Sequence, residues 1–201
     1  MKKYEFTGET KQVGFLGNIT LKRIRATTEF GIVKIGDLGG WIEKEENLSH
    51  KGKAWVCGDA KVWGNAKVCG NAEVCGDAKV CGDAKVWGNA KVCGDAKVCG
   101  NAEVWGNAEV WGNAEVCGDA EVFSISHVLV IGPIGSRNDF TTFFRDKDSE
   151  ITVKCGCFLG KIDKFLEKVC ETHGDSKHAL VYRAAVEIAK QQIDLSEKKQ
   201  L

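Results

Sequence analysis

The sequence lacks several features that would assign it to a familiar class. Acidic and basic side chains balance at 28 each, so no net charge attracts a nucleic-acid polymer or a membrane surface. Its apolar runs, such as residues 128–131, are far shorter than the roughly 20 residues that a membrane-spanning helix needs. The first six residues lack the apolar core of a secretory signal. We therefore expect a cytoplasmic protein that binds neither membranes nor nucleic-acid polymers.

What the sequence does contain is one six-residue phrase, repeated without interruption from Ala54 to Val122. Its order is Ala, a charged residue (Trp55 in the first hexad), Val, Cys or Trp, Gly, and Asp or Asn. Because side chains of a strand alternate between two faces, Ala and Val share one face, and the charged residue and Cys or Trp share the other. The small apolar pair therefore points inward, and Gly with Asp or Asn turns the corner.

A fixed hexapeptide period is typical of a solenoid of short parallel strands. Three six-residue sides close one triangular coil, so the twelve hexads predict about four regular coils. The predicted fold class is mainly β, with a left-handed parallel β-helix over 54–122. An N-terminal β cap with a first irregular coil occupies 1–53, and a small C-terminal α+β module occupies 123–201.

The flanking segments lack the period. In the cap, residues 2–7, 19–26 and 31–35 are strand-like, and glycine-rich turns lie at 17–18 and 36–40. An open solenoid end exposes unpaired strand edges, so we expect the cap to cover one end.

The C-terminal module is expected to hold three strands, at 128–131, 140–144 and 151–157, followed by two helices. An apolar stripe at helical spacing begins at Ile162. Gly174 fits the end of the first helix, and Asp175 or Ser176 fits the start of the second.

Every third hexad stacks, so the outward Cys or Trp positions form three columns. One column holds Cys57, Cys75, Cys93 and Trp111, and the second holds Trp63, Cys81, Cys99 and Cys117. The third holds Cys69, Trp87, Trp105 and Phe123. Large apolar residues on an outer face mark contact surfaces, so we predict that the third column forms the interface of a dimer or trimer. Alternatively, these side chains only pack along their neighbours.

The chain has ten cysteines, seven of them in the repeat. Without a secretion signal we expect them to be reduced. Stacked thiols have the chemistry of soft-metal ligands, but nothing else in the repeat completes a tetrahedral site.

The corners stack as well. Asp59, Asp77 and Asp95 share one corner with Asn113, where either a cation or solvent must separate the like charges. Asn71, Asn89 and Asn107 share another corner, where we expect a ladder of amide hydrogen bonds.

The segment Gly132-Pro-Ile-Gly-Ser-Arg-Asn-Asp139 is the predicted ligand site. Its glycines permit close backbone approach, Ser136 adds a hydroxyl, and Arg137 grips phosphate or carboxylate. It is not a nucleotide-binding P-loop, because it has no Gly-Lys-Ser/Thr and a strand follows it. The predicted ligand-binding residues are Gly132, Gly135, Ser136, Arg137, Asn138, Thr141 and Thr142. A tight structural turn is the alternative.

Two cysteines, Cys155 and Cys157, together with His173 and His178, form a further candidate set. Both sulfurs of a Cys-x-Cys pair on one strand face the same way, but zinc sites usually leave two or more residues between cysteines. We therefore favour buried thiols and expect no metal.

Enzymes built on hexapeptide coils, such as acyltransferases and γ-class carbonic anhydrases, need histidines at the coil edges. No histidine lies between Ala54 and Val122, although His50 and His127 flank the array. The repeats also lack an insertion that would build an acyl-donor pocket. We expect no enzyme activity and no cofactor.

Five segments together resemble uncharacterised phage and prophage hexapeptide-repeat proteins. These segments are residues 38–48 (LGGWIEKEENL), the hexad array, residues 132–143 (GPIGSRNDFTTF), and residues 153–160 (VKCGCFLG) with the later 172–174 (THG). In such proteins Tyr often occupies the slot held here by Cys or Trp, which implies a packing role for that slot. The resemblance implies a small accessory phage protein in the cytoplasm of the bacterial host.

The leading hypothesis is a non-enzymatic, oligomeric β-helix scaffold. Its C-terminal module binds an anionic small molecule, and sequestration of a host nucleotide immune signal, an anti-defence role, fits this outline. The second hypothesis is a structural solenoid that binds a host protein. A hexapeptide acyltransferase-like enzyme is the third.

Overall fold

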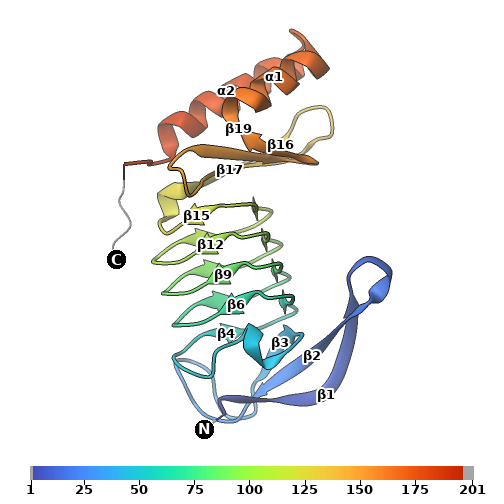
Figure 1. Cartoon of the computed structure of the whole chain (residues 1–201), viewed down its shortest axis with the longest axis vertical. Coiled ribbons are helices and arrows are strands. Elements are labelled where there is room, and N and C mark those ends of the chain that lie inside the picture. Colours follow the sequence, from blue (N-terminus) through green and yellow to red (C-terminus); the bar gives the residue numbers. More distant parts are fainter. Residues whose placement is uncertain (1, 197–201) are drawn as a thin grey trace.

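The computed structural model describes residues 2–196, and its centre is a β-solenoid of stacked parallel strands (Figure 1). Each hexad contributes one strand of two residues, the second of which is the inward Val. These strands are β4 (Trp55–Val56), β5 (Lys61–Val62), β6 (Lys67–Val68), β7 (Glu73–Val74), β8 (Lys79–Val80), β9 (Lys85–Val86), β10 (Lys91–Val92), β11 (Lys97–Val98), β12 (Glu103–Val104), β13 (Glu109–Val110), β14 (Glu115–Val116) and β15 (Glu121–Val122). Along the stack, strands three places apart in this order pair with each other, as β4 pairs with β7 and β7 with β10. The predicted solenoid is confirmed.

The inside of the solenoid is a continuous apolar column. The inward Ala and Val side chains of the repeat are buried, with at most 2% of any of them exposed. Val74, Val92 and Val110 are register partners on successive coils. Because a coil buries its apolar face only against its neighbours, the stack is stable as a whole and both ends need covers.

The N-terminal segment covers one end. Strands β1 (Tyr4–Val13) and β2 (Ile19–Ala26) form an antiparallel hairpin that projects from the solenoid, with the short turn η1 (Phe15–Gly17) at its tip (Figure 1). Strand β3 (Leu38–Ile42) is antiparallel to β2 and parallel to β5, so the hairpin sheet continues into one side of the solenoid. A second turn, η2 (Glu45–Asn47), follows in the first irregular coil.

One expectation for this cap is wrong, and a second holds only in part. The segment 31–35 is a turn closed by a bridge between Phe30 and Val33. Gly36, with φ of 92°, does lie in a turn, but Gly39 and Gly40 lie in β3 and serve close packing. A Cβ at Gly39 would lie 2.5 Å from Ile24 Cγ1, and one at Gly40 would lie 2.6 Å from the carbonyl oxygen of Ala60.

The C-terminal module covers the other end. After the turn η3 (Ile125–His127), an antiparallel sheet forms from β16 (Val128–Ile134), β17 (Asp139–Arg145), β18 (Ile151–Cys155) and β19 (Phe158–Lys161). Helices α1 (Ile162–His173) and α2 (Lys177–Gln192) pack on this sheet, on the side away from the solenoid (Figure 1). Gly174 ends α1, and the Ser176 hydroxyl caps α2, as predicted.

Within the described residues this module has four strands, where three were predicted. The expected strand over 151–157 is two strands, because Gly156, with φ of 57°, turns the chain back into β19. Strand β16 also continues through Gly132 to Ile134, so the predicted loop of 132–139 shrinks to a tight turn at 135–138.

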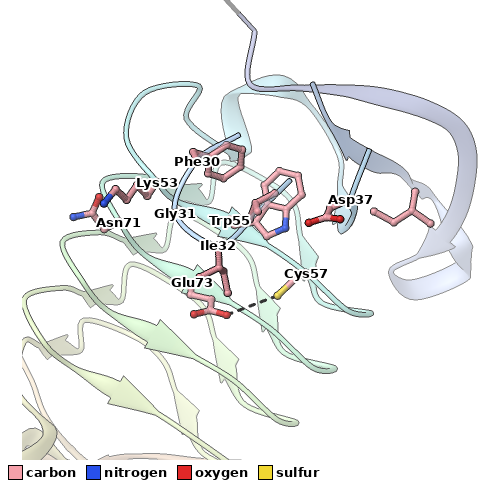
Figure 2. Close-up of a pocket in the computed structure, with 11 residues that line it drawn as sticks. Phe30, Gly31, Ile32, Asp37, Lys53, Trp55, Cys57, Asn71 and Glu73 are labelled. Atoms are coloured by element: carbon pink, nitrogen blue, oxygen red, sulfur yellow. Dashed lines mark hydrogen bonds between the residues drawn. The ribbon is translucent and has the colours of Figure 1, made fainter. Parts of the chain in front are cut away.

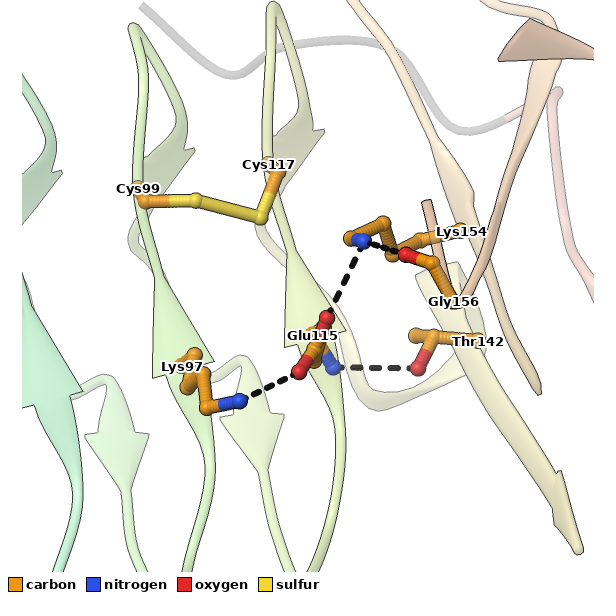
Figure 3. Close-up of a disulfide and its surroundings, with 7 residues drawn as sticks. All are labelled: Lys97, Cys99, Glu115, Cys117, Thr142, Lys154 and Gly156. Atoms are coloured by element: carbon orange, nitrogen blue, oxygen red, sulfur yellow. Dashed lines mark hydrogen bonds and ion pairs between the residues drawn. A yellow bond between two sulfur atoms is a disulfide. The ribbon is translucent and has the colours of Figure 1, made fainter. Parts of the chain in front are cut away.

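Polar contacts hold the module on the last coil (Figure 3). The backbone N–H of Glu115 donates to Thr142 Oγ1 at 3.0 Å, and the Glu115 carboxylate pairs with Lys97 at 2.5 Å and Lys154 at 3.3 Å. Arg145, which is 4% exposed, pairs with Glu121 at 3.0 Å. The solenoid thus sets the position of β17 and β18, which carry the candidate site.

The outward columns form as predicted, but the expectation of reduced cysteines is wrong for four of them. Cys75 bonds to Cys93, and Cys99 bonds to Cys117, with Cα atoms 4.7 Å apart in each pair. In-register stacking of parallel strands brings residues eighteen apart into the range that a disulfide needs.

The corners differ from one another. The Asn71 amide donates to Asn89 at 3.1 Å and Asn89 donates to Asn107 at 3.2 Å, which confirms the amide ladder. At the acidic corner, Asp59 accepts hydrogen bonds from Lys11 and from the Trp41 indole. The cap therefore offsets the negative charge of Asp59. Among residues 2–196, no group of three or more His, Cys, Asp or Glu side chains has an arrangement suited to a metal ion.

Neither α1 nor α2 is long and apolar enough to cross a membrane, and no other helix described between residues 2 and 196 is.

Candidate functional site

A pocket of about 270 Å³ lies in the C-terminal module, between the β18–β19 turn and the two helices. Residues from the 135–138 turn, from the strand ends and from both helices line it. They are Ser136, Arg137, Cys155, Cys157, Phe158, Phe165, Lys168, Val169, Thr172, His173 and Tyr182. The predicted Ser-Arg pair and the predicted Cys-x-Cys pair, considered separately in the sequence, therefore share one pocket.

The 135–138 turn places Ser136 and Arg137 at the mouth of this pocket. Gly135 has φ of 74° and Asn138 has φ of 52°, and the Asn138 N–H donates to the Gly135 carbonyl at 3.3 Å. A Cβ at Gly135 would lie 1.8 Å from Tyr182 Oη. Only glycine leaves room for Tyr182 to pack beneath the turn, so the close approach expected of this glycine is made by the protein's own tyrosine.

The β18–β19 turn provides the seat for the Arg137 guanidinium. A Cβ at Gly156 would lie 1.6 Å from Arg137 Nη2, so the guanidinium lies directly on the glycine backbone between the two cysteines. The charge of Cys155, together with hydrogen bonds to Cys155 and Cys157, raises the pKa of Arg137. Arg137 is exposed and keeps its positive charge at the pocket mouth.

Tyr182 and His173 form the helical wall of the pocket. Burial, and then the neighbouring Cys155, raises the pKa of Tyr182 to about 12, so its hydroxyl stays protonated at neutral pH. The His173 ring stacks on Tyr182 with centroids 5.8 Å apart. Thr141 Oγ1 lies 3.3 Å from Cys155 Sγ and donates to it.

The charge in the pocket is of one sign. Arg137 and Lys168 are cationic, Lys168 also pairs with Glu171 of α1 at 3.0 Å, and none of the lining residues that the structure describes is acidic. Phe158, Phe165 and Tyr182 supply apolar and aromatic surface beside these cations. The arrangement suits a small molecule with an anionic group and a flat or apolar part.

The structure separates the predicted ligand-binding residues into three groups. Ser136 and Arg137 line the pocket, with Gly135 beneath them and Asn138 exposed on the same turn. Thr141 contacts Cys155 from the neighbouring strand. Gly132 lies exposed within β16, and Thr142 points to the solenoid and accepts from Glu115, so these two are outside the pocket.

Nine of the eleven lining residues were absent from the predicted binding set, and four of these bear on its chemistry: Cys155, Cys157, His173 and Tyr182. The first three had a sequence signal, the Cys-x-Cys spacing with nearby histidines, which was weighed as a metal set and interpreted as buried thiols. That interpretation is wrong for Cys157, which is exposed because it lies in the β18–β19 turn. Tyr182 had no signal beyond its place on a helix, because its role depends on how α2 crosses the 135–138 turn.

The predicted interface column is a stack of rings. Trp87 and Trp105 are parallel with centroids 5.7 Å apart, and Trp105 lies 4.6 Å from Phe123. Phe123 is buried at 6% exposure, against Arg145 and His127. Cys69 lies one coil before Trp87 in the same column. The contacts within the chain account for part of this apolar surface, and the oligomer interface stays a prediction.

A second hollow, of about 480 Å³, lies between the cap and the first coils (Figure 2). Phe30, Ile32 and Trp55 form its apolar part, and Lys53 and Glu73 lie at its rim. Ile32 is 91% exposed, which is unusual for a large apolar side chain. This groove mixes charges of both signs and has no convergent cationic set comparable to the C-terminal pocket.

Comparison with known proteins places no family name on this chain: no family model matches it, and no curated protein is significantly similar to it.

Proposed function

We propose that the protein is a non-enzymatic β-solenoid scaffold whose C-terminal module binds a small anionic molecule at Arg137. The observation that carries the proposal is the exposed guanidinium, seated on Gly156 at the mouth of a pocket whose other charged wall residue is Lys168. The aromatic wall beside these cations suits a nucleotide, in which a phosphate accompanies a flat base. In a phage, such a protein would sequester a host nucleotide signal.

Calorimetric titration tests this proposal. Cyclic dinucleotides and ADP-ribose derivatives are titrated into the unmodified protein and into Arg137→Ala. We expect the substitution to cost roughly 1.5–3 kcal/mol of binding free energy, the range for a charge-assisted hydrogen bond. Lys164→Ala is the matched control, because Lys164 is an exposed cation of α1 that pairs with Glu167 and does not line the pocket. Equal binding by Arg137→Ala, or no binding of any of these ligands by the unmodified protein, contradicts the proposal.

We also propose that the column of Trp87, Trp105 and Phe123 joins subunits into a dimer or trimer. Replacing both tryptophans with Lys places two charges on this column, and light scattering should then give the mass of one chain. Trp111→Lys is the control, since Trp111 is 50% exposed in a different column and should leave the assembly intact. A mass of one chain for the unmodified protein contradicts this assignment.

A protein-binding solenoid is the second candidate, and exposed apolar groups at the N-terminal end favour it. Phe15 and Leu16 at the hairpin tip are 90% and 91% exposed, and Ile32 lines the groove between the cap and the first coils. Surfaces of this kind mark contact sites for other proteins.

A further inference from the structure

The C-terminal pocket contains a pair of thiols. The proposed binding of an anion does not use them. Cys157 is exposed in the β18–β19 turn, and Cys155 is half-buried at the end of β18, with only Gly156 between them. Both contact the Arg137 guanidinium, which lies across Gly156. Two nucleophilic groups and a fixed cation therefore share the mouth of one cavity.

The surroundings of this pair differ from those of other cysteines in the chain. On the solenoid, Cys75, Cys93, Cys99 and Cys117 are consumed in disulfides. Burial raises the pKa of Cys57 to about 11, with Glu73 adding to the effect, and burial also raises the pKa of Cys69 and Cys81. A raised pKa disfavours the thiolate, which is the reactive form of a cysteine. Cys155 and Cys157, in contrast, lie against the Arg137 guanidinium.

We propose that Cys157 and Cys155 form a dithiol site that exchanges with small anionic disulfides. The cations Arg137 and Lys168, with no acidic lining residue among those described, select a disulfide that carries carboxylates. The proposal shares Arg137 with the proposed anion site, but it depends on the two sulfur atoms and not on nucleotide binding.

The exchange proceeds in two balanced steps. The Cys157 thiolate attacks one sulfur of the external disulfide, a Cys157–ligand disulfide forms, and one ligand thiolate leaves. The Cys155 thiolate then attacks Cys157 Sγ, a Cys155–Cys157 disulfide forms, and the second ligand thiolate leaves. The two protein thiols lose two electrons, the external disulfide gains them, and the two thiol protons pass to solvent or to the released thiolates.

The experiment compares an anionic and a cationic disulfide on the full chain, kept without added reductant so that the solenoid disulfides remain. Glutathione disulfide and cystamine are each added, and peptide mass spectrometry follows every cysteine with time. We expect Cys157 to react roughly tenfold faster with glutathione disulfide than with cystamine. Cys170, exposed on α1 outside the pocket, is the internal control and should show no such preference. Reaction at Cys157 no faster than at Cys170 overturns the proposal.

Three variants separate the roles. Cys155→Ser should trap the glutathione adduct on Cys157, whereas the unmodified protein passes on to the Cys155–Cys157 disulfide. Arg137→Gln should abolish the preference for the anionic disulfide, and Arg137→Lys, which keeps the charge, should retain part of it. Thermal unfolding checks that each variant is folded. A trapped adduct in the unmodified protein, or an unchanged preference in Arg137→Gln, contradicts the mechanism.

The outcome is distinguishable from that of the proposed function. Loss of nucleotide binding in Arg137→Ala with an unreactive Cys157 refutes the dithiol site alone. Selective exchange at Cys157 without nucleotide binding refutes the proposed ligand class and leaves the dithiol site standing.

Discussion

Replacing Val92 with aspartate is expected to lower the free energy of unfolding by several kcal/mol or to prevent folding altogether. Val92 is completely buried in the middle of the solenoid, between Val74 and Val110 of the neighbouring coils. A carboxylate there would have no water and no cation, and taking up a proton would still leave a polar group without a partner. Thermal and urea unfolding, followed by circular dichroism, measure the loss.

Lys67→Asp is the matched control, because it introduces the same side chain on the outward face. Lys67 is exposed, and its register partner on the next coil is Lys85, a cation that tolerates a carboxylate beside it. We expect this variant to unfold at nearly the same temperature and urea concentration as the unmodified protein. If Val92→Asp were as stable as Lys67→Asp, the inward assignment of Val would be wrong.

Arg145→Met is the second substitution with a large expected effect, about 3–5 kcal/mol of unfolding free energy. Arg145 Nη1 donates to the Glu121 carboxylate at 3.0 Å, Nη2 donates to Ser149 at 2.7 Å, and the guanidinium lies 4.9 Å from the Phe123 ring centroid. Methionine fills a similar space but leaves Glu121, itself largely buried, without this ion pair. Chemical unfolding of the full chain measures the difference.

Lys147→Met removes a second ion pair between the same two parts of the molecule and is the control. Lys147 pairs with Asp119 at 2.7 Å, but both side chains are well exposed, and exposed pairs contribute little. A large loss in Lys147→Met, or a negligible loss in Arg145→Met, would show that burial does not decide which contacts hold the module on the solenoid.

The architecture of the middle of the chain could be predicted from the sequence because the repeat that specifies it involves residues close together in the sequence. A period of six with Ala and Val two residues apart leaves one face apolar in every hexad, and only stacking buries that face. The same register predicted the Asn71–Asn89–Asn107 ladder and the three outward columns. The helix boundary at Gly174 and Ser176 was equally local, because capping depends on adjacent residues.

The flanking strands were less predictable because a glycine in the sequence is compatible both with a turn and with close packing inside a strand. Gly39 and Gly40 look like a turn in the sequence, yet they lie in β3 where Ile24 and Ala60 approach too closely for a side chain. Gly156 looks like part of a strand, yet it turns the chain and seats Arg137. The distinction depends on neighbours that are distant in the sequence.

The sequence by itself determined the repeat and its inward and outward faces, and it indicated Ser136 and Arg137 as a polar pair beside flexible glycines. Only the tertiary structure decided that Arg137 lies between Cys155 and Cys157, or that Tyr182 packs beneath Gly135. Likewise, only the stacking of coils brings Cys75 and Cys93 within bonding range. Hydrophobic periodicity acts between near neighbours and is visible in the sequence. The pocket depends on a hairpin, a turn and two helices meeting at one point. Local sequence patterns do not indicate where these elements meet.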